Sequence, residues 1–354
     1  MKPGILAALA VWTVLLERYT IGGSNALGQK KPLPPDVSFQ VIVFFDDQLH
    51  RVLRTMYAAE FYAGAYFNAI NLIFGDMICP RIKFDVVTVL EKDDPFQKQA
   101  LVTHGDEVDA SATLTRTAQY LGKRQDLTAA DVIFIMTKRR VYTVDTPGGR
   151  KDYAAQGLTW EGGICDQMKK IVIVHDDGAY FGSLQKAGFQ LARLLGAPTS
   201  CTPLYYQLTT NRKPFSLNSC ATTSITNFLW NMPYEDLRRC LKQEIRSSVN
   251  RKFHTALPDF LVPLVGFCDQ VPRPEQSDHI MCTRKRVKRF KYHIRPSLKL
   301  EVCTFACCND RPFEPHIYLA FDGTKCNSSS GQGLCVGGKC LQRQLSVNFV
   351  YPDI

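Results

Sequence analysis

Apolar residues over the first 250 positions alternate between short β-rich runs and longer segments with helical spacing. Four apolar runs, each bounded by Pro, Gly or charged residues, predict buried strands at 39–45, 82–90, 130–136 and 170–175. Segments with apolar residues at helical spacing predict helices at 48–74, 109–121, 184–195, 223–230 and 234–247. Because the strands alternate with helices, we expect an α/β fold with a mainly parallel sheet covered on both faces.

The first residues have the pattern of a secretory signal peptide. Lys2 supplies a positive charge, residues 4–16 form an apolar run, and small residues follow up to Ala26. We predict a signal peptide over residues 1–26 and a secreted, extracellular mature protein. The apolar run is too short for a membrane anchor, and no later stretch is long and apolar enough to be a transmembrane segment.

Thirteen cysteines in an exported chain predict disulfide bonds, because the extracellular compartment is oxidising. Five lie in the first 250 residues and eight crowd the last hundred, which predicts two domains with different sources of stability. The first domain can bury a core, whereas the second is short and needs covalent links. Cys79 follows an apolar helix, and a buried, inert thiol is favoured there over an intermolecular disulfide.

A net charge of +10 favours acidic partners such as sulfated glycans, anionic lipid or nucleic acid. Because the chain is expected to be exported, we expect glycans or lipid rather than nucleic acid. Eight Lys or Arg fall within residues 284–299. The candidate anion-binding residues in this run are Arg284, Lys285, Arg286, Lys288, Arg289, Lys291 and Arg295. The run is also typical of a solvated hairpin, and 286–289 resembles a furin-type processing site. Asn327 is a predicted glycosylation site, since Ser328 and Ser329 follow it.

Residues 156–200 resemble the active-site region of reprolysins, the adamalysin-like branch of the metzincin zinc metalloproteases. The matching motifs are GGIC at 162–165, DGAY at 177–180 and LLGAP at 194–198, and FSLNSC at 215–220 continues the match. The segments DGTKC at 322–326 and GGKC at 337–340 resemble the cysteine-rich modules of tick salivary metalloproteases.

The resemblance implies a metzincin-like mixed, mainly parallel sheet with covering helices, followed by a small disulfide-rich domain. The expected domains are a reprolysin-like domain at 36–250 and a cysteine-rich domain at 265–345. If the pairing of the family holds, Cys165 bonds to Cys240 and Cys201 bonds to Cys220. The connectivity of the eight tail cysteines stays open.

The zinc motif of this family is degenerate in this chain. Two histidines one helical turn apart and a third after a glycine turn bind the metal, and a glutamate beside the first activates water. The ligand positions hold Phe189, Arg193 and Thr199, and the base position holds Gln190. Phenylalanine and arginine offer no lone pair, and a dication about 4 Å from a guanidinium is repelled by about 8 kcal/mol. Glutamine cannot accept the proton that a general base must take.

The sequence therefore predicts an inactive metalloprotease homologue that acts by binding a host or extracellular protein. No cofactor is expected, although the family uses zinc. The resemblance to salivary proteins implies a role at a feeding site, toward haemostasis, matrix or immunity. Two alternatives stay open: an atypical zinc metalloendopeptidase with unrecognised ligands, and activity of the basic tail alone.

Overall fold

The computed structural model describes most of the first 258 residues and parts of the C-terminal region. The described ranges are 33–144, 149–153, 156–178, 181–201, 217–241, 248–254, 256–258, 279–281, 303–309, 316–320, 323–328, 331–336 and 339–342. The predicted signal peptide, at 1–26, lies outside them, as does the basic run from Arg284 to Arg295.

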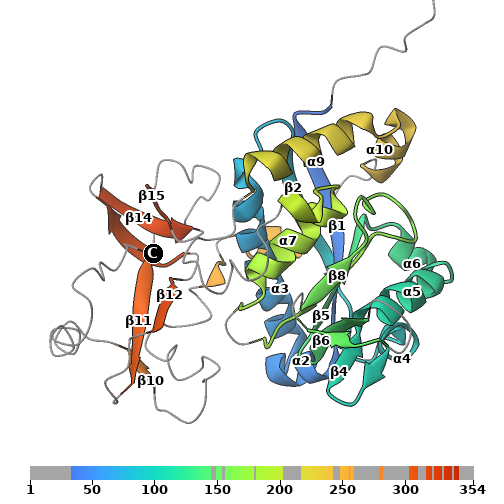
Figure 1. Cartoon of the computed structure of the whole chain (residues 1–354), viewed down its shortest axis with the longest axis horizontal. Coiled ribbons are helices and arrows are strands. Elements are labelled where there is room, and N and C mark those ends of the chain that lie inside the picture. The colour runs from blue at the N-terminus through green and yellow to red at the C-terminus, as the bar shows by residue number, and fades with distance from the viewer. Residues whose placement is uncertain are drawn as a thin grey trace, which may run out of the picture. The chain divides into compact units, whose positions relative to one another are not determined.

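A five-stranded sheet forms the centre of the α/β part of the chain, with strand order β2-β1-β5-β9-β8 (Figure 1). Its strands are β1 (Asp36–Phe45), β2 (Arg81–Val89), β5 (Val132–Thr137), β8 (Gly157–Thr159) and β9 (Ile171–His175). Strands β2, β1, β5 and β9 run parallel, and the short edge strand β8 pairs antiparallel to β9. The mainly parallel sheet that the sequence predicts is therefore confirmed.

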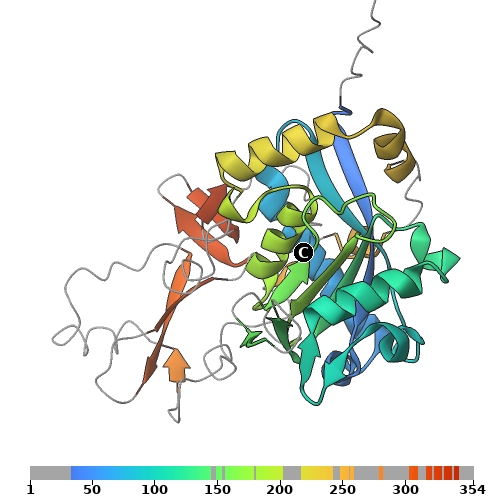
Figure 2. The same cartoon turned by 45° about the vertical axis from the view of Figure 1, so that its right-hand side comes forward.

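Helices cover both faces of this sheet (Figures 1 and 2). The larger ones are α2 (Asp47–Leu53), α3 (Met56–Ile73), α5 (Ala110–Leu121), α7 (Leu184–Leu194), α9 (Ser219–Asn231) and α10 (Tyr234–Cys240). Alternate residues of each strand face opposite layers: Ile133 and Ile135 pack in the cluster that includes α5, whereas Phe134 contacts Tyr66 and Phe67 of α3. The sheet is thus buried on both sides, as its apolar runs indicate.

Side-chain caps move two helix boundaries away from those predicted. The segment 48–74 forms two helices rather than one, because Arg54 has a φ of 65° and the Thr55 side chain accepts a hydrogen bond from the Ala58 N–H to begin α3. Helix α9 begins at Ser219 rather than at residue 223, since Asn218 accepts from the Ala221 N–H.

Several short elements surround this frame. They are η1 (Phe74–Asp76), α4 (Phe96–Ala100), α6 (Gln125–Thr128), η2 (Thr199–Cys201) and α11 (Val249–Lys252), together with a four-stranded sheet of β3 (Thr103–His104), β4 (Glu107–Asp109), β6 (Arg140–Val144) and β7 (Lys151–Asp152). None of them has a clear signal in the apolar pattern, because each is short. In the described part of the chain, no helix has the length and apolar character needed to cross a membrane.

The C-terminal region contains two small antiparallel sheets and is rich in disulfides, in line with the sequence. One sheet consists of β10 (His279–Met281), β11 (Thr304–Asn309) and β12 (His316–Leu319), and the other of β13 (Lys325–Ser328), β14 (Gly331–Val336) and β15 (Lys339–Gln342). Disulfides join Cys303 to Cys335 and Cys326 to Cys340. Asn327, the predicted glycosylation site, is exposed on β13.

Candidate functional site

The segment that resembles the zinc motif begins on α7, which packs against the edge of the central sheet, and ends at η2. The helix ends at Leu194, and Gly196, with a φ of +87°, then allows the Ala197 N–H to reach back to the Ala192 carbonyl at 2.9 Å. A Cβ at Gly196 would lie 2.5 Å from the Phe228 ring of α9, so only glycine permits this approach. Phe228 thereby fixes the point where the chain turns toward the third ligand position.

The GGIC segment docks onto the end of the same helix. The Gly162 N–H donates to the Arg193 carbonyl at 2.9 Å, and the Ile164 N–H donates to the Leu194 carbonyl at 3.1 Å. A Cβ at Gly162 would also meet Phe228, at 2.9 Å. The GGIC and LLGAP motifs are therefore held together by backbone hydrogen bonds and by the ring of Phe228.

The two disulfides that the resemblance implies in this domain are present. Cys165 bonds to Cys240, which ties the GGIC segment to the end of α10. Cys201 bonds to Cys220, which ties η2 to the first turn of α9. Both disulfides hold the surroundings of α7 in place.

Gln190, at the base position, points into the protein rather than toward solvent. It is 1% exposed, and its Nε2 donates to the Gly157 carbonyl of β8 at 3.2 Å. Its Oε1 has no hydrogen-bond partner among the described residues. Phe189 beside it is half-buried.

Arg193, at the second ligand position, forms an ion pair with an acidic residue. Its guanidinium lies 3.8 Å from the Glu161 carboxylate, and its Nε is buried without a hydrogen-bond partner among the described residues. Thr199, at the third ligand position, is exposed at the start of η2.

These four side chains do not fit a zinc ion. The base position is occupied by an amide buried against a carbonyl, and the second ligand position by a cation already paired with Glu161. Neither Phe189 nor Arg193 has a lone pair to give, and a threonine hydroxyl is a poor zinc ligand. Gln190 and Arg193 can instead hold helix α7 against β8 and the loop that follows it.

A buried carboxylate, Asp176, organises the loop that leads into α7. It accepts hydrogen bonds from Tyr62 Oη at 2.6 Å, from the Gly178 N–H at 2.8 Å, and from both the N–H and the Oγ of Ser183. Since Ser183 Oγ donates to Asp176, Tyr66 Oη at 2.5 Å must donate to Ser183. This network could not be predicted from the sequence, because Tyr62 on α3 is more than 100 residues away from Asp176.

Burial and neighbouring charge perturb the pKa values of this group. Burial raises the pKa of Asp176 above its usual value, and the adjacent Asp177 raises it further, while hydrogen bonds from Ser183 and Tyr62 oppose the shift. Burial also lowers the pKa of Lys186 on α7 to about 8, against the attraction of the two aspartates. Lys186 Nζ donates to the Gln156 side chain, which anchors α7 next to β8.

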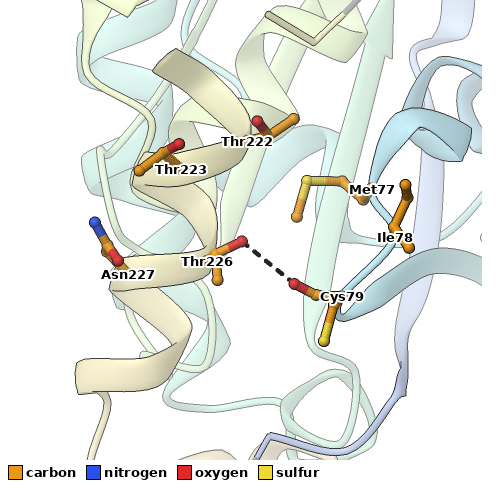
Figure 3. Close-up of a pocket in the computed structure, with 7 residues that line it drawn as sticks. All are labelled: Met77, Ile78, Cys79, Thr222, Thr223, Thr226 and Asn227. Carbon is orange, nitrogen blue, oxygen red and sulfur yellow. Dashed lines mark hydrogen bonds between the residues drawn. The ribbon is translucent and has the colours of Figure 1, made fainter. Parts of the chain in front are cut away.

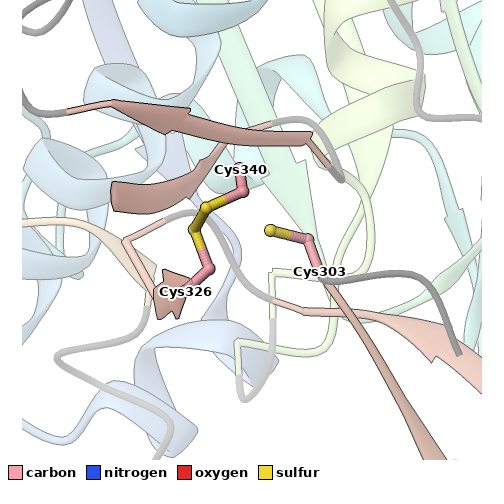
Figure 4. A group of neighbouring side chains, drawn as sticks. All are labelled: Cys303, Cys326 and Cys340. Atoms are coloured by element: carbon pink, nitrogen blue, oxygen red, sulfur yellow. A yellow bond between two sulfur atoms is a disulfide. The ribbon is translucent and has the colours of Figure 1, made fainter. Parts of the chain in front are cut away.

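The sulfur atoms of Cys303, Cys326 and Cys340 lie within 4.8 Å of one another, and they are the one such group of potential metal ligands among the described residues (Figure 4). All three are in disulfides, with Cys326 bonded to Cys340 and Cys303 bonded to Cys335. A disulfide sulfur is not the thiolate that zinc requires. This cluster is therefore a pair of adjacent crosslinks.

The expectation that Cys79 is buried is wrong. Its thiol is free and exposed, next to Ile78, which is 84% exposed. The residue lies opposite α9, where Thr226 Oγ1 donates to the Cys79 carbonyl at 3.5 Å, beside a cavity of about 320 Å³ (Figure 3). Helix α3 ends at Ile73 and η1 at Asp76, so Cys79 lies in the connection to β2 rather than on the buried face of a helix.

Alkylation of the native protein with a maleimide, without reductant, is expected to label Cys79, because an exposed thiol is accessible to the reagent. Peptide mass spectrometry locates the label. In the Cys79→Ser variant, the peptide that contains residue 79 should carry no label. A wild-type peptide that stays unmodified in native protein, but reacts after unfolding, would contradict the exposed thiol.

Comparisons with known proteins assign no family to this chain. No protein-family model matches it, and a search of curated proteins returns no match. The resemblance to reprolysins therefore rests on the motifs and on their arrangement around α7.

Proposed function

We propose that this protein is a secreted, catalytically inactive homologue of reprolysin-type metalloproteases that acts by binding an extracellular protein. The observation that carries the proposal is the chemistry of α7, where Gln190 is buried against the Gly157 carbonyl and Arg193 faces Glu161. A peptidase of this type needs metal ligands and a general base at these positions. Here the same positions carry structural contacts.

The intact surroundings of the motif support a binding role. Three features hold the scaffold around α7: the hydrogen-bonded turn at Gly196, the docked GGIC segment, and the disulfide between Cys165 and Cys240. The several disulfides are typical of extracellular proteins, which supports secretion. A net charge of +10 supports an acidic partner, such as a protein with an anionic surface, a sulfated glycan or anionic lipid. The role at a host feeding site rests on the resemblance to tick salivary proteins.

Metal analysis of the secreted protein tests the proposal. The natural protein is expected to contain zinc near zero per chain and to show no chelator-sensitive peptidase activity, since Phe189 and Arg193 supply no ligand. Inductively coupled plasma mass spectrometry measures the metal in protein purified without refolding. Zinc at about one ion per chain, retained through dialysis, would overturn the proposal and favour the atypical zinc endopeptidase.

A revertant keeps this test informative. The variant Phe189→His, Gln190→Glu, Arg193→His and Thr199→His is expected to gain about one zinc ion per chain, because it restores three imidazole ligands and the base. A matched control places glutamine at 189, 193 and 199 and should gain no zinc. A revertant that folds, as judged by circular dichroism, but binds no more zinc than this control would contradict a metalloprotease scaffold.

A further inference from the structure

A cavity of about 430 Å³ opens between the first two helices of the domain, and the activity proposed above does not use it. Its walls are formed by Val52 and Leu53 of α2, by Tyr57, Phe61 and Tyr62 of α3, and by Gly178 of the loop after β9. The volume lies in the range of small-molecule sites, about 300 to 1,000 Å³, and such sites are lined mainly by apolar and aromatic side chains. Tyr57 at this cavity is 65% exposed, so the apolar walls reach the surface.

A rare turn lies between the residues that form the walls. Arg54 has φ and ψ of 65° and −41°, and the Thr55 N–H donates to the Leu53 carbonyl at 2.8 Å. This is a classic γ-turn, a strained conformation for a residue other than glycine. Strained turns persist where the surroundings hold them, and they cluster at active sites, ligand-binding segments and switch regions. The turn separates Leu53 from Tyr57, which are both cavity residues.

Arg54 is also the one charged side chain in residues 46–73 that forms no ion pair with a described residue. Asp46 and Asp47 face Arg139, Arg51 faces Asp47, and Glu60 faces Lys252 at 2.9 Å. Arg54 is exposed and makes no side-chain hydrogen bond or ion pair with any described residue. Arg54 does not line the cavity but directly follows Leu53, which does, so its long side chain can extend toward the cavity without losing another contact.

We propose that this cavity binds a small amphiphilic anion, with an alkyl or aryl tail against Leu53, Phe61 and Tyr62 and an anionic head group at Arg54. Apolar walls favour the tail through loss of its contact with water. The unpaired guanidinium selects a carboxylate or a similar anion over a neutral or cationic head group. The site is separate from Gln190 and Arg193 of α7, so it does not depend on the proposed loss of zinc chemistry.

Decanoate tests the cavity, with binding measured by isothermal titration calorimetry on the full secreted chain. Ala58 is half-buried in the cavity wall on α3, and Ala58→Phe is expected to fill the space and weaken decanoate binding about tenfold or more. Leu53→Trp, from the opposite wall, should have the same effect. Melting temperatures close to that of the wild type show that the variants fold. If one variant does not fold, the other still tests the proposal.

The charge selection is tested by comparing decanoate with decanol in the Arg54→Gln variant. Decanoate is expected to bind about threefold more weakly, whereas decanol should bind as in the wild type. Arg238→Gln on α10 removes another exposed arginine and serves as the matched control. The proposal is overturned if decanoate shows no saturable binding, or if both cavity-filling variants bind it as tightly as the wild type. Equal losses in the Arg54 and Arg238 variants would instead assign the binding to net charge.

Discussion

Replacing Asp176 by alanine is expected to lower the free energy of unfolding by about 3 to 5 kcal/mol and the melting temperature by about 10 °C. The carboxylate is 2% exposed and accepts hydrogen bonds from Tyr62, Gly178 and Ser183. Without it, three sets of donors lose their acceptor inside the protein, at about 1 to 3 kcal/mol each. Chemical denaturation and differential scanning calorimetry measure the change.

The effect should depend on pH with a defined sign. Because burial raises the pKa of Asp176 above 3.8, its ionisation costs stability as the pH rises from 3.8 toward the folded-state value. The alanine variant lacks this cost, so its stability deficit is expected to be larger at pH 4 than at pH 8. Asp93→Ala removes an exposed aspartate and should change stability by less than about 0.5 kcal/mol. A deficit in the Asp176 variant as small as that of this control would show that the network is not a stabilising unit.

The central sheet could be predicted because its strands carry their own signal. The run from Val132 to Met136 is apolar at every position and fully buried, as expected for a strand between two helical layers. The edge strand β8 carries no such signal, because it has three residues and pairs along one side only. Its position is set by its hydrogen bonds to β9 and by Gln190 beneath it, and these contacts are remote in sequence.

In the candidate site too, some features could be predicted from the sequence and others could not. Phe189 and Arg193 have no lone pair for zinc and Thr199 would be a poor ligand, and this follows from side-chain chemistry alone, so the sequence is sufficient to predict it. The Arg193 side chain faces Glu161. Glu161 lies near it because the adjacent GGIC segment docks on the end of α7, and the sequence alone does not predict this contact. The γ-turn at Arg54 could not be predicted either, because 48–74 has the composition of one continuous helix.

Removing the disulfide between Cys165 and Cys240 is expected to destabilise the domain more than removing the one between Cys201 and Cys220. The first closes a loop of 75 residues and the second a loop of 19, so the entropy that each removes from the unfolded chain differs. Loop closure predicts losses of about 4.5 and about 3.2 kcal/mol for the paired alanine variants.

Guanidinium denaturation of Cys165→Ala/Cys240→Ala and Cys201→Ala/Cys220→Ala, each compared with wild type, measures both losses. Paired replacements are used because a single one would leave a reactive thiol. The Cys165 disulfide also holds the GGIC segment against α7, where the Gly162 and Ile164 N–H groups donate to the carbonyls of Arg193 and Leu194. Hydrogen exchange at these two amides is therefore expected to speed up in the first variant and to stay unchanged in the second. The reverse order of stability losses would mean that local packing around η2, rather than loop length, governs how these crosslinks stabilise the domain.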